Sequence, residues 1–278
     1  MSRMGGLRYI NPLDTGAMTS RVPSPRGSRV SAGGLDERPP RTHLQSLKMR
    51  MMAVDLLRLA KERMTYRELS RLTGLGITVV SRYVKGHVLP GLDRARMIWR
   101  TLNPVCGLQA HLLSRIRMDD GVAIDVSGLV GDPWVLNLAA SDCLNRYAGY
   151  RVTRILTTAV NGVPLASAVA QALEAPMAVA KRHMDVGVEE FLETVYGVNG
   201  ENLELLYLPK GSIRPRDSVL LVDDVVRTGR TIRALLRLVR KAKAEPAGVY
   251  CLIGFRDTVQ RLREQGLRVE TALEVMGP

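Results

Sequence analysis

The sequence predicts an α/β protein in which an all-α domain is followed by a domain built around a parallel sheet. From about Leu44 to about residue 117 the apolar residues recur with a helical period, and after Val122 short Val/Ile/Leu runs alternate with longer amphipathic segments. Strands that alternate with helices are typical of a parallel sheet with helical crossovers. The charge divides the chain in a similar way: residues 1–100 contain 19 Lys and Arg against 7 Asp and Glu, whereas residues 101–278 contain 21 against 20.

The composition and the cysteine spacing indicate what kind of core, thiol chemistry and cellular location to expect. A chain of 278 residues has room for two domains, and with 46% hydrophobic but only 4% aromatic residues its cores must be aliphatic. Cys106, Cys143 and Cys251 are far apart, so we expect reduced, buried thiols rather than a zinc site or disulfides. No apolar run is long enough to cross a membrane and no signal peptide is visible, so we expect a cytoplasmic protein without a membrane partner.

Three segments are expected along the chain. Residues 1–41 are rich in Gly, Pro, Ser and Arg and are predicted to form a disordered basic tail. Met49, Met51 and Met52 lie just before the first periodic segment, so the sequence leaves the true start codon open. Residues 42–117 are predicted to form the all-α domain, and residues 118–278 the parallel-sheet domain.

The all-α domain is predicted to contain four helices and a further helical stretch. The first starts near Leu44, the second is opened by Thr65, the third covers about Ile77–Val84, and the fourth covers about Leu92–Leu102. Thr65 and Glu68 have the spacing of a capping box, in which each side chain satisfies a free backbone N–H at the start of the helix. The further stretch follows a seam at Pro104 and Gly107 and runs to about Arg117.

The second and third helices have the pattern of a helix-turn-helix. Gly74 stands where the short turn needs a positive φ angle. The inner side is predicted to comprise Leu69, Leu72, Leu75, Val80 and Tyr83. Ser70 departs from the pattern, because alanine is commoner at this close approach of the two helices.

A helix-turn-helix places its second helix in the major groove of double-stranded DNA. The residues expected to contact DNA are Arg67, Thr78, Ser81, Arg82 and Lys85. Arg71 and His87 are expected to make further contacts with the DNA backbone. A guanidinium group such as that of Arg82 can form a forked contact with guanine or phosphate. The alternative is an ordinary helical hairpin with a solvated basic face.

Four apolar runs are expected to be strands of the second domain. They are Ile155–Val160, Ala175–Ala180, Ser218–Val222 and Gly248–Gly254, with helices at about Pro164–Leu173 and Thr231–Lys243. Residues 186–209 are loosely patterned and are expected to form a mobile flap, as a long loop or a hairpin.

The strongest local signal covers residues 218–231. A buried strand leads into Asp223 and Asp224, then a turn with the sequence Arg227-Thr228-Gly229-Arg230-Thr231 opens a helix. The free N–H groups of such a turn and of the helix start favour an anion, and the threonine hydroxyls add donors. The two carboxylates cannot face a phosphate, so they suit vicinal ribose hydroxyls or a cation. A structural strand-to-helix turn capped by threonines is the alternative.

This segment resembles the phosphoribosyl pyrophosphate (PRPP) binding motif of the type I phosphoribosyltransferases. The resemblance implies that PRPP is bound by Asp223, Asp224, Arg227, Thr228, Gly229, Arg230 and Thr231, with Mg²⁺ accompanying PRPP and no protein-held metal site. Residues 155–166 resemble the pyrophosphate loop and the helix start of the same family. The pyrophosphate side would then comprise Thr158, Asn161, Gly162, Lys181 and Arg182, although Lys181 and Arg182 alone would equally suit an exposed strand end.

The combination of the two domains is similar to the archaeal phosphoribosyltransferase-like transcriptional regulators (GfcR type). It implies a homodimeric DNA-binding regulator with PRPP or a related nucleotide as effector. The alternative is an active orotate or purine phosphoribosyltransferase with an appended DNA-binding domain, and RNA targeting is a weaker third option. We favour the regulator, because no element for recognising a base is evident and Phe255 is the only aromatic residue suited to stacking on one. No catalytic residue is therefore assigned, and the operator, the target genes, the sign of regulation and the exact effector stay open.

Overall fold

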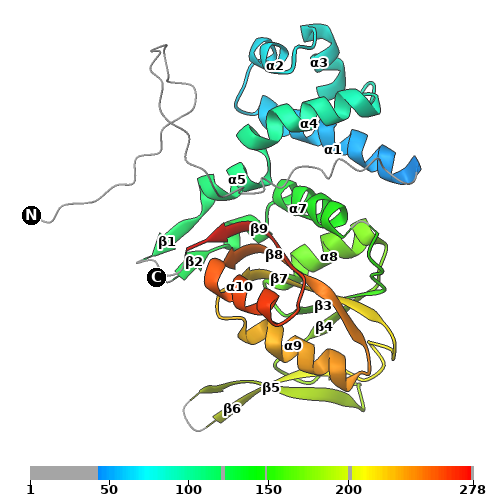
Figure 1. The fold of residues 1–278 in the computed structure, drawn as a ribbon, viewed down its shortest axis with the longest axis vertical. Helices are drawn as coiled ribbons and strands as arrows, with labels where there is room; N and C mark the ends of the chain where they lie inside the picture. Colours follow the sequence, from blue (N-terminus) through cyan, green and yellow to red (C-terminus); the bar gives the residue numbers. More distant parts are fainter. Residues whose placement is uncertain (1–42, 120–122, 148, 200–201, 277–278) are drawn as a thin grey trace, which may run out of the picture. The chain divides into compact units, whose positions relative to one another are not determined.

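The computed structural model describes residues 43–119, 123–147, 149–199 and 202–276. The predicted basic tail, residues 1–41, lies outside the described residues. Within them the protein has an N-terminal helical region and a C-terminal region built on a parallel sheet, as the sequence predicts (Figure 1).

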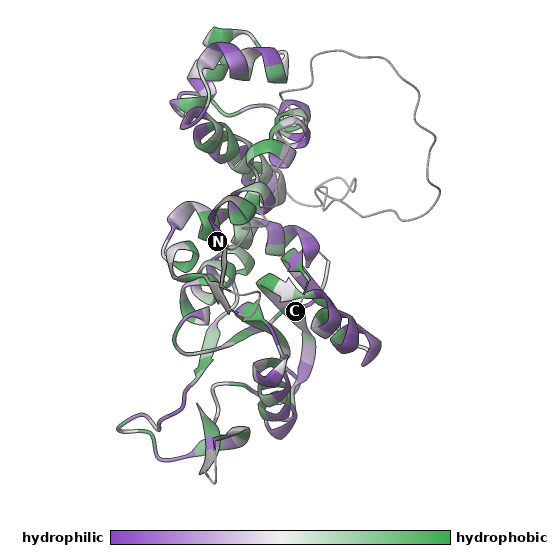
Figure 2. Cartoon of the chain, turned by 90° about the vertical axis from the view of Figure 1, so that its left-hand side faces the viewer, coloured by the Kyte–Doolittle hydropathy of each residue, from purple (hydrophilic) through white to green (hydrophobic). Residues whose placement is uncertain are grey.

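The helical region consists of α1 (His43–Lys61), α2 (Tyr66–Thr73), α3 (Ile77–Val84), α4 (Leu92–Cys106) and α5 (Leu108–Arg115). Its core is formed mainly by α1 and α4, and it includes Leu56, Ile98 and Trp99. Helix α4 runs past Pro104, where a seam is expected, and Gly107 separates it from α5. In Figure 2 these helices carry both hydrophilic and hydrophobic segments, in keeping with helices that have one buried side.

The pair α2 and α3 has the local geometry that its sequence predicts. Thr65 and Glu68 form the predicted capping box at the start of α2. Gly74 ends α2 with a φ of 67°, a left-handed conformation that glycine adopts without strain. The Ser70 hydroxyl donates a hydrogen bond of 2.6 Å to the carbonyl of Leu75 across the turn. The prediction that Leu72 is buried is wrong, because its side chain is 40% exposed.

The C-terminal region contains a five-stranded parallel sheet with the order β4-β3-β7-β8-β9. The strands are β3 (Arg154–Thr158), β4 (Met177–Ala180), β7 (Ser218–Val226), β8 (Glu245–Phe255) and β9 (Val269–Val275). The crossovers are α8 (Gly162–Leu173), α9 (Arg230–Lys241) and α10 (Arg256–Glu264). Since parallel strands all end at the same edge, the loops that follow β3, β4 and β7 gather there.

Helices cover both faces of this sheet, as the alternation of side chains along β7 shows. Leu220 and Val222 pack with α6 (Ser127–Val130), α7 (Pro133–Arg146) and α8, whereas Val219 and Leu221 pack with α9 and α10. Strand β7 is longer than the predicted Ser218–Val222, because residues up to Val226 still pair with β8. The two aspartates are therefore part of the strand, and the turn begins at Arg227.

Two antiparallel pairs complete the described structure. β1 (Arg117–Asp119) pairs with β2 (Ala123–Asp125), and β5 (Phe191–Asn199) pairs with β6 (Asn202–Pro209). The second pair occupies the predicted flap and is a hairpin rather than a loop. Arg237 of α9 holds it by donating hydrogen bonds to the Thr194 hydroxyl and to the carbonyl of Val195.

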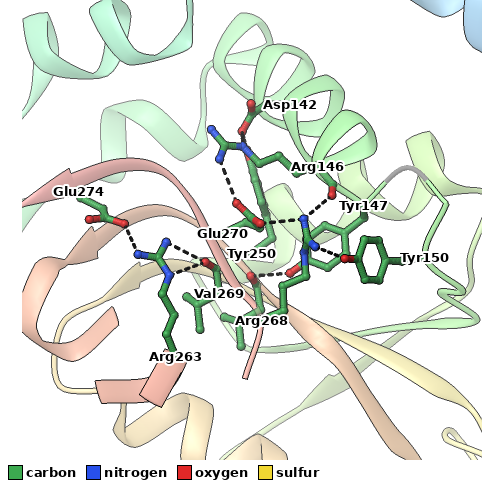
Figure 3. Close-up of polar contacts among 11 residues, drawn as sticks. Asp142, Arg146, Tyr147, Tyr150, Tyr250, Arg263, Arg268, Val269, Glu270 and Glu274 are labelled. Atoms are coloured by element: carbon green, nitrogen blue, oxygen red, sulfur yellow. Dashed lines mark hydrogen bonds and ion pairs between the residues drawn. The ribbon is translucent and has the colours of Figure 1, made fainter. Parts of the chain in front are cut away.

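A network of charges joins α7 to β8 and β9 (Figure 3). The Nε of Arg146 donates to Oδ2 of Asp142 at 2.7 Å, and its second nitrogen lies 3.1 Å from Glu270. The Tyr250 hydroxyl donates to the same Asp142 oxygen at 3.0 Å, and Arg268 pairs with Glu270 at 2.8 Å. Burial raises the pKa of Asp142, so its charge depends on these partners.

Three further findings concern the predicted chemistry of the chain. Cys106, Cys143 and Cys251 are free and buried, as the sequence predicts. Among the described residues no group of three or more His, Cys, Asp or Glu side chains is placed to hold a metal ion. None of the described helices has the length and apolar character of a membrane span.

Candidate ligand-binding site

The first cavity lies at the end of β7, where the strand gives way to α9, and has a volume of about 400 Å³. All seven residues predicted to bind PRPP line it: Asp223, Asp224, Arg227, Thr228, Gly229, Arg230 and Thr231. Gly229 has a φ of 71°, and the hydroxyl oxygen of Thr228 accepts a hydrogen bond of 3.4 Å from the backbone N–H of Arg230. The turn therefore closes tightly at the start of α9.

The second cavity, of about 610 Å³, lies between the loop after β3 and the end of β4. All five residues predicted for the pyrophosphate side line it: Thr158, Asn161, Gly162, Lys181 and Arg182. His183, Met184 and Asp185 from the segment after β4 extend its wall. The two strand ends thus contribute to one cavity, as the parallel topology predicts.

The two cavities adjoin, because they share lining residues from three elements and the loop after β3: Asn161, Tyr196, Asp223, Asp224, Val225 and Thr231. The Tyr196 hydroxyl lies 3.5 Å from the Thr231 hydroxyl oxygen. An extended ligand can therefore occupy both cavities. Its middle part would then lie beside the two aspartates, where the cavities meet. Their volumes are within the range of pockets that bind small molecules.

Asp223 and Asp224 are 5% and 8% exposed, an unusual degree of burial for neighbouring carboxyl groups. The carboxyl oxygens accept short-range backbone hydrogen bonds, from Asp224 N–H to Asp223 at 3.2 Å and from Val225 N–H to Asp224 at 2.9 Å. Burial, and then the neighbouring Asp224, raise the pKa of Asp223 well above its ordinary value. A positive charge or hydroxyl donors in the cavity would stabilise the ionised form.

The two basic residues of the second cavity already have partners in the protein. The Lys181 ammonium lies 2.7 Å from Oδ1 of Asp185, and the Arg182 guanidinium lies 5.2 Å from the centre of the Tyr196 ring. Lys181 also pairs through its backbone with Tyr207 of β6, at 2.9 and 2.8 Å. The hairpin β5–β6 is therefore connected directly to this cavity.

The sequence did not reveal several lining residues, notably Tyr196, Val126 and Asp185. Val126 and Tyr196 come from segments without a readable period, and their approach depends on long-range packing. In the structure the register of β5 shifts between Val195 and Gly197, beside Tyr196. Such bulges often turn a side chain toward a site. Phe255, considered as a base-stacking residue, is 4% exposed and lines the first cavity.

The residues predicted to contact DNA lie on the second and third helices of the helical region. Arg67 is on α2, whereas Thr78, Ser81 and Arg82 are on α3 and Lys85 follows it directly. Ser81 is half-buried, and the other four are exposed. The structure thus leaves these basic groups at the surface while Leu69, Val80 and Tyr83 hold the two helices together from inside.

Comparisons with known proteins agree with the geometry of the C-terminal region. Residues 136–273 match the family model described as "Phosphoribosyl transferase domain". The xanthine phosphoribosyltransferase of Heliobacterium modesticaldum is 30% identical over 152 residues, which cover 53% of this chain and 81% of that enzyme. The crystal structure of adenine phosphoribosyltransferase from Rhodothermus marinus aligns with a TM-score of 0.52 and 25% identity, over 59% of this chain and 97% of that one.

A curated relative of another kind is the probable purine biosynthesis transcriptional regulator PurR of Streptococcus pneumoniae serotype 4. It is 29% identical over 170 residues, or 60% of this chain. The match spans 61% of the regulator's length. The chain is therefore similar both to enzymes and to a regulator, and the matched family model leaves residues 1–135 outside.

Proposed function

Because this chain belongs to the phosphoribosyltransferase family, we propose that it is a DNA-binding transcriptional regulator whose phosphoribosyltransferase domain binds PRPP or a related nucleotide as effector. The observation that carries the proposal is that one chain joins two features. The two aspartates and the phosphate-type turn (residues 227–231) line a pair of adjoining cavities, and a capped two-helix unit exposes basic residues. The similarity to the PurR regulator supports the combination.

Each cavity suits one part of the ligand. The turn of residues 227–231 offers backbone N–H groups, the hydroxyls of Thr228 and Thr231, and the start of α9 to the 5-phosphate group. The buried carboxylates of Asp223 and Asp224 would accept hydrogen bonds from the two ribose hydroxyls. The pyrophosphate would lie in the second cavity, against Thr158, Asn161, Gly162, Lys181 and Arg182.

The carboxyl groups present also fit the Mg²⁺ that accompanies PRPP. Mg²⁺ prefers oxygen ligands and is commonly held by one or two carboxylates together with substrate phosphates and water. Asp223 and Asp224 would supply those carboxylates, and the raised pKa of Asp223 marks a place where a cation would relieve an unfavourable buried charge. Bound Mg²⁺ would neutralise the charge of the pyrophosphate.

The helical region would read double-stranded DNA as a helix-turn-helix. Helix α3 would enter the major groove with Thr78, Ser81 and Arg82, while Arg67 and Lys85 would contact phosphates. A homodimer would place two such helices on two half-sites. The proposal includes two further points: the protein belongs to the archaeal regulators of the GfcR type, and it acts in the cytoplasm.

Calorimetry with PRPP and Mg²⁺, alongside a promoter-binding assay, tests the proposal. We expect the chain to bind PRPP, and PRPP to change its affinity for DNA. The double variant Asp223→Asn with Asp224→Asn should lose PRPP binding and keep DNA binding without effector. Normal PRPP affinity in that variant would refute the ligand assignment, and the absence of promoter binding by the unmodified chain would refute the regulatory role.

The second candidate is an active orotate or purine phosphoribosyltransferase. The similarity to the xanthine phosphoribosyltransferase of Heliobacterium modesticaldum, 81% of whose length is matched, favours this candidate. In that reaction a nucleobase nitrogen displaces pyrophosphate from the sugar, and the loops of both cavities would stabilise the charges of the departing group. Incubation with PRPP, Mg²⁺ and xanthine, adenine or orotate, with pyrophosphate release as the readout, distinguishes the candidates, since a regulator that only senses its effector releases none.

A further inference from the structure

Two carbonyl groups of the phosphate-type turn are held from outside the cavity. The Thr258 hydroxyl, on the first turn of α10, donates a hydrogen bond of 2.7 Å to the carbonyl of Arg227. The Arg233 guanidinium, on α9, donates one of 2.7 Å to the carbonyl of Thr228. Thr258 is 3% exposed, and neither it nor Arg233 is among the described residues that line either cavity.

Holding a carbonyl also fixes the amide on the other side of the same peptide bond. A trans peptide unit is planar, so the N–H of one residue points opposite to the C=O of the residue before it. When Thr258 draws the Arg227 carbonyl toward α10, the N–H of Thr228 points away from α10. Arg233 has the same effect on the N–H of Gly229. Both residues line the cavity, so N–H groups that point away from these supports can face a ligand there.

The direction of the Thr258 hydrogen bond is itself fixed. A guanidinium nitrogen of Arg261 lies 3.2 Å from the Thr258 hydroxyl oxygen and can only donate. The hydroxyl therefore accepts from Arg261 and has its own proton for the carbonyl of Arg227. A Cβ on Gly229 would lie 3.2 Å from the Thr258 methyl and 3.4 Å from Arg233, so the turn also packs directly on both supports.

We propose that Thr258 is a positioning residue for the phosphate group of the ligand: it orients the Thr228 N–H through the carbonyl of Arg227. The inference rests on the proposed role of this turn as the phosphate site. It extends the site to a residue on α10 that is not among the described residues lining either cavity. Arg233 has the parallel role for the N–H of Gly229.

The test uses ribose 5-phosphate as the probe of the first cavity and inorganic pyrophosphate as the probe of the second, both by calorimetry on the full chain. The variant Thr258→Val keeps the shape of the side chain and removes the hydrogen bond. It should weaken ribose 5-phosphate binding about three- to tenfold, the equivalent of one hydrogen bond, and leave pyrophosphate affinity unchanged. Thr258→Ser keeps the hydroxyl and should bind ribose 5-phosphate like the unmodified chain.

Thr73→Val is the matched control. The Thr73 hydroxyl donates an equally short bond of 2.7 Å to the carbonyl of Leu69 and is 6% exposed, but it lies in α2. This variant should leave both affinities unchanged. Unchanged ribose 5-phosphate affinity in Thr258→Val would overturn the inference, as would equal losses for both probes, or a Thr258→Ser variant as weak as Thr258→Val. If the unmodified chain binds neither probe nor PRPP, the proposed function is wrong and the inference falls with it.

Discussion

Replacing Gly162 with alanine should lower the free energy of unfolding by about 1–3 kcal/mol, the usual cost of an extra methyl group in a packed interior. Gly162 is buried at the start of α8, where a Cβ would lie 2.4 Å from the Thr157 hydroxyl oxygen and 3.4 Å from Oδ1 of Asp223. Only the first distance requires an atom to move by a large amount. Thr157 is fully buried and β-branched, so its hydroxyl cannot swing aside cheaply.

A double-mutant cycle isolates this single contact. The Thr157 hydroxyl has no hydrogen-bond partner among the described residues, so the cost of Thr157→Ala should come mainly from its buried methyl group, about 1 kcal/mol. In that background Gly162→Ala should cost almost nothing, whereas in a Thr157→Val background, which keeps an atom in the hydroxyl position, its cost should persist. Urea denaturation followed by circular dichroism measures all of these variants, and any change in helix propensity cancels in the cycle. An equal cost of Gly162→Ala in the parent and in Thr157→Ala would refute the reasoning.

Three further predictions concern the charged groups. Because burial raises the folded-state pKa of Asp223, its contribution to stability is complete at low pH and is lost as the pH rises through that pKa. The melting temperature of Asp223→Asn should therefore rise relative to that of the parent between pH 4 and 8, and a difference in melting temperature that stays constant over this range would contradict the prediction. Arg146→Ala should cost about 3 kcal/mol in urea denaturation, since it leaves Asp142 buried beside Glu270 without its cation, whereas Arg240→Ala, at an exposed position on α9, should change little. Arg82→Ala should weaken promoter binding and reduce its dependence on salt in a filter-binding or anisotropy titration, because fewer counterions are released; unchanged binding would exclude Arg82 from the interface.

Sequence patterns predicted correctly those elements whose start and end are set by residues next to them in the chain. Helix α3 covers Ile77–Val84 as expected, since Gly76 precedes it and its apolar side is regular. The capping box at Thr65 needs only four consecutive residues, and the turn at Gly229 follows from the chemistry of five.

Long-range packing decided the remainder. Strand β7 continues through Asp223 and Asp224 because β8 pairs with it as far as Gly254, and no local preference places two carboxylates in a buried strand. Leu72 fits the apolar side of α2 by spacing, but the structure leaves it exposed. Tyr196 and Thr258 reach the candidate site only because the hairpin and α10 fold back on it, which no pattern near either residue signals.

The chain has two tryptophans, and the fold gives one to each region. Trp99 is 6% exposed in the core of the helical region, whereas Trp134, at the start of α7, packs against the core of the sheet region. Each indole is therefore an intrinsic optical label for one part of the protein. Variants that retain only one tryptophan would report the melting of the two parts separately. They would also show whether a ligand bound to the sheet region changes the stability of the helical region.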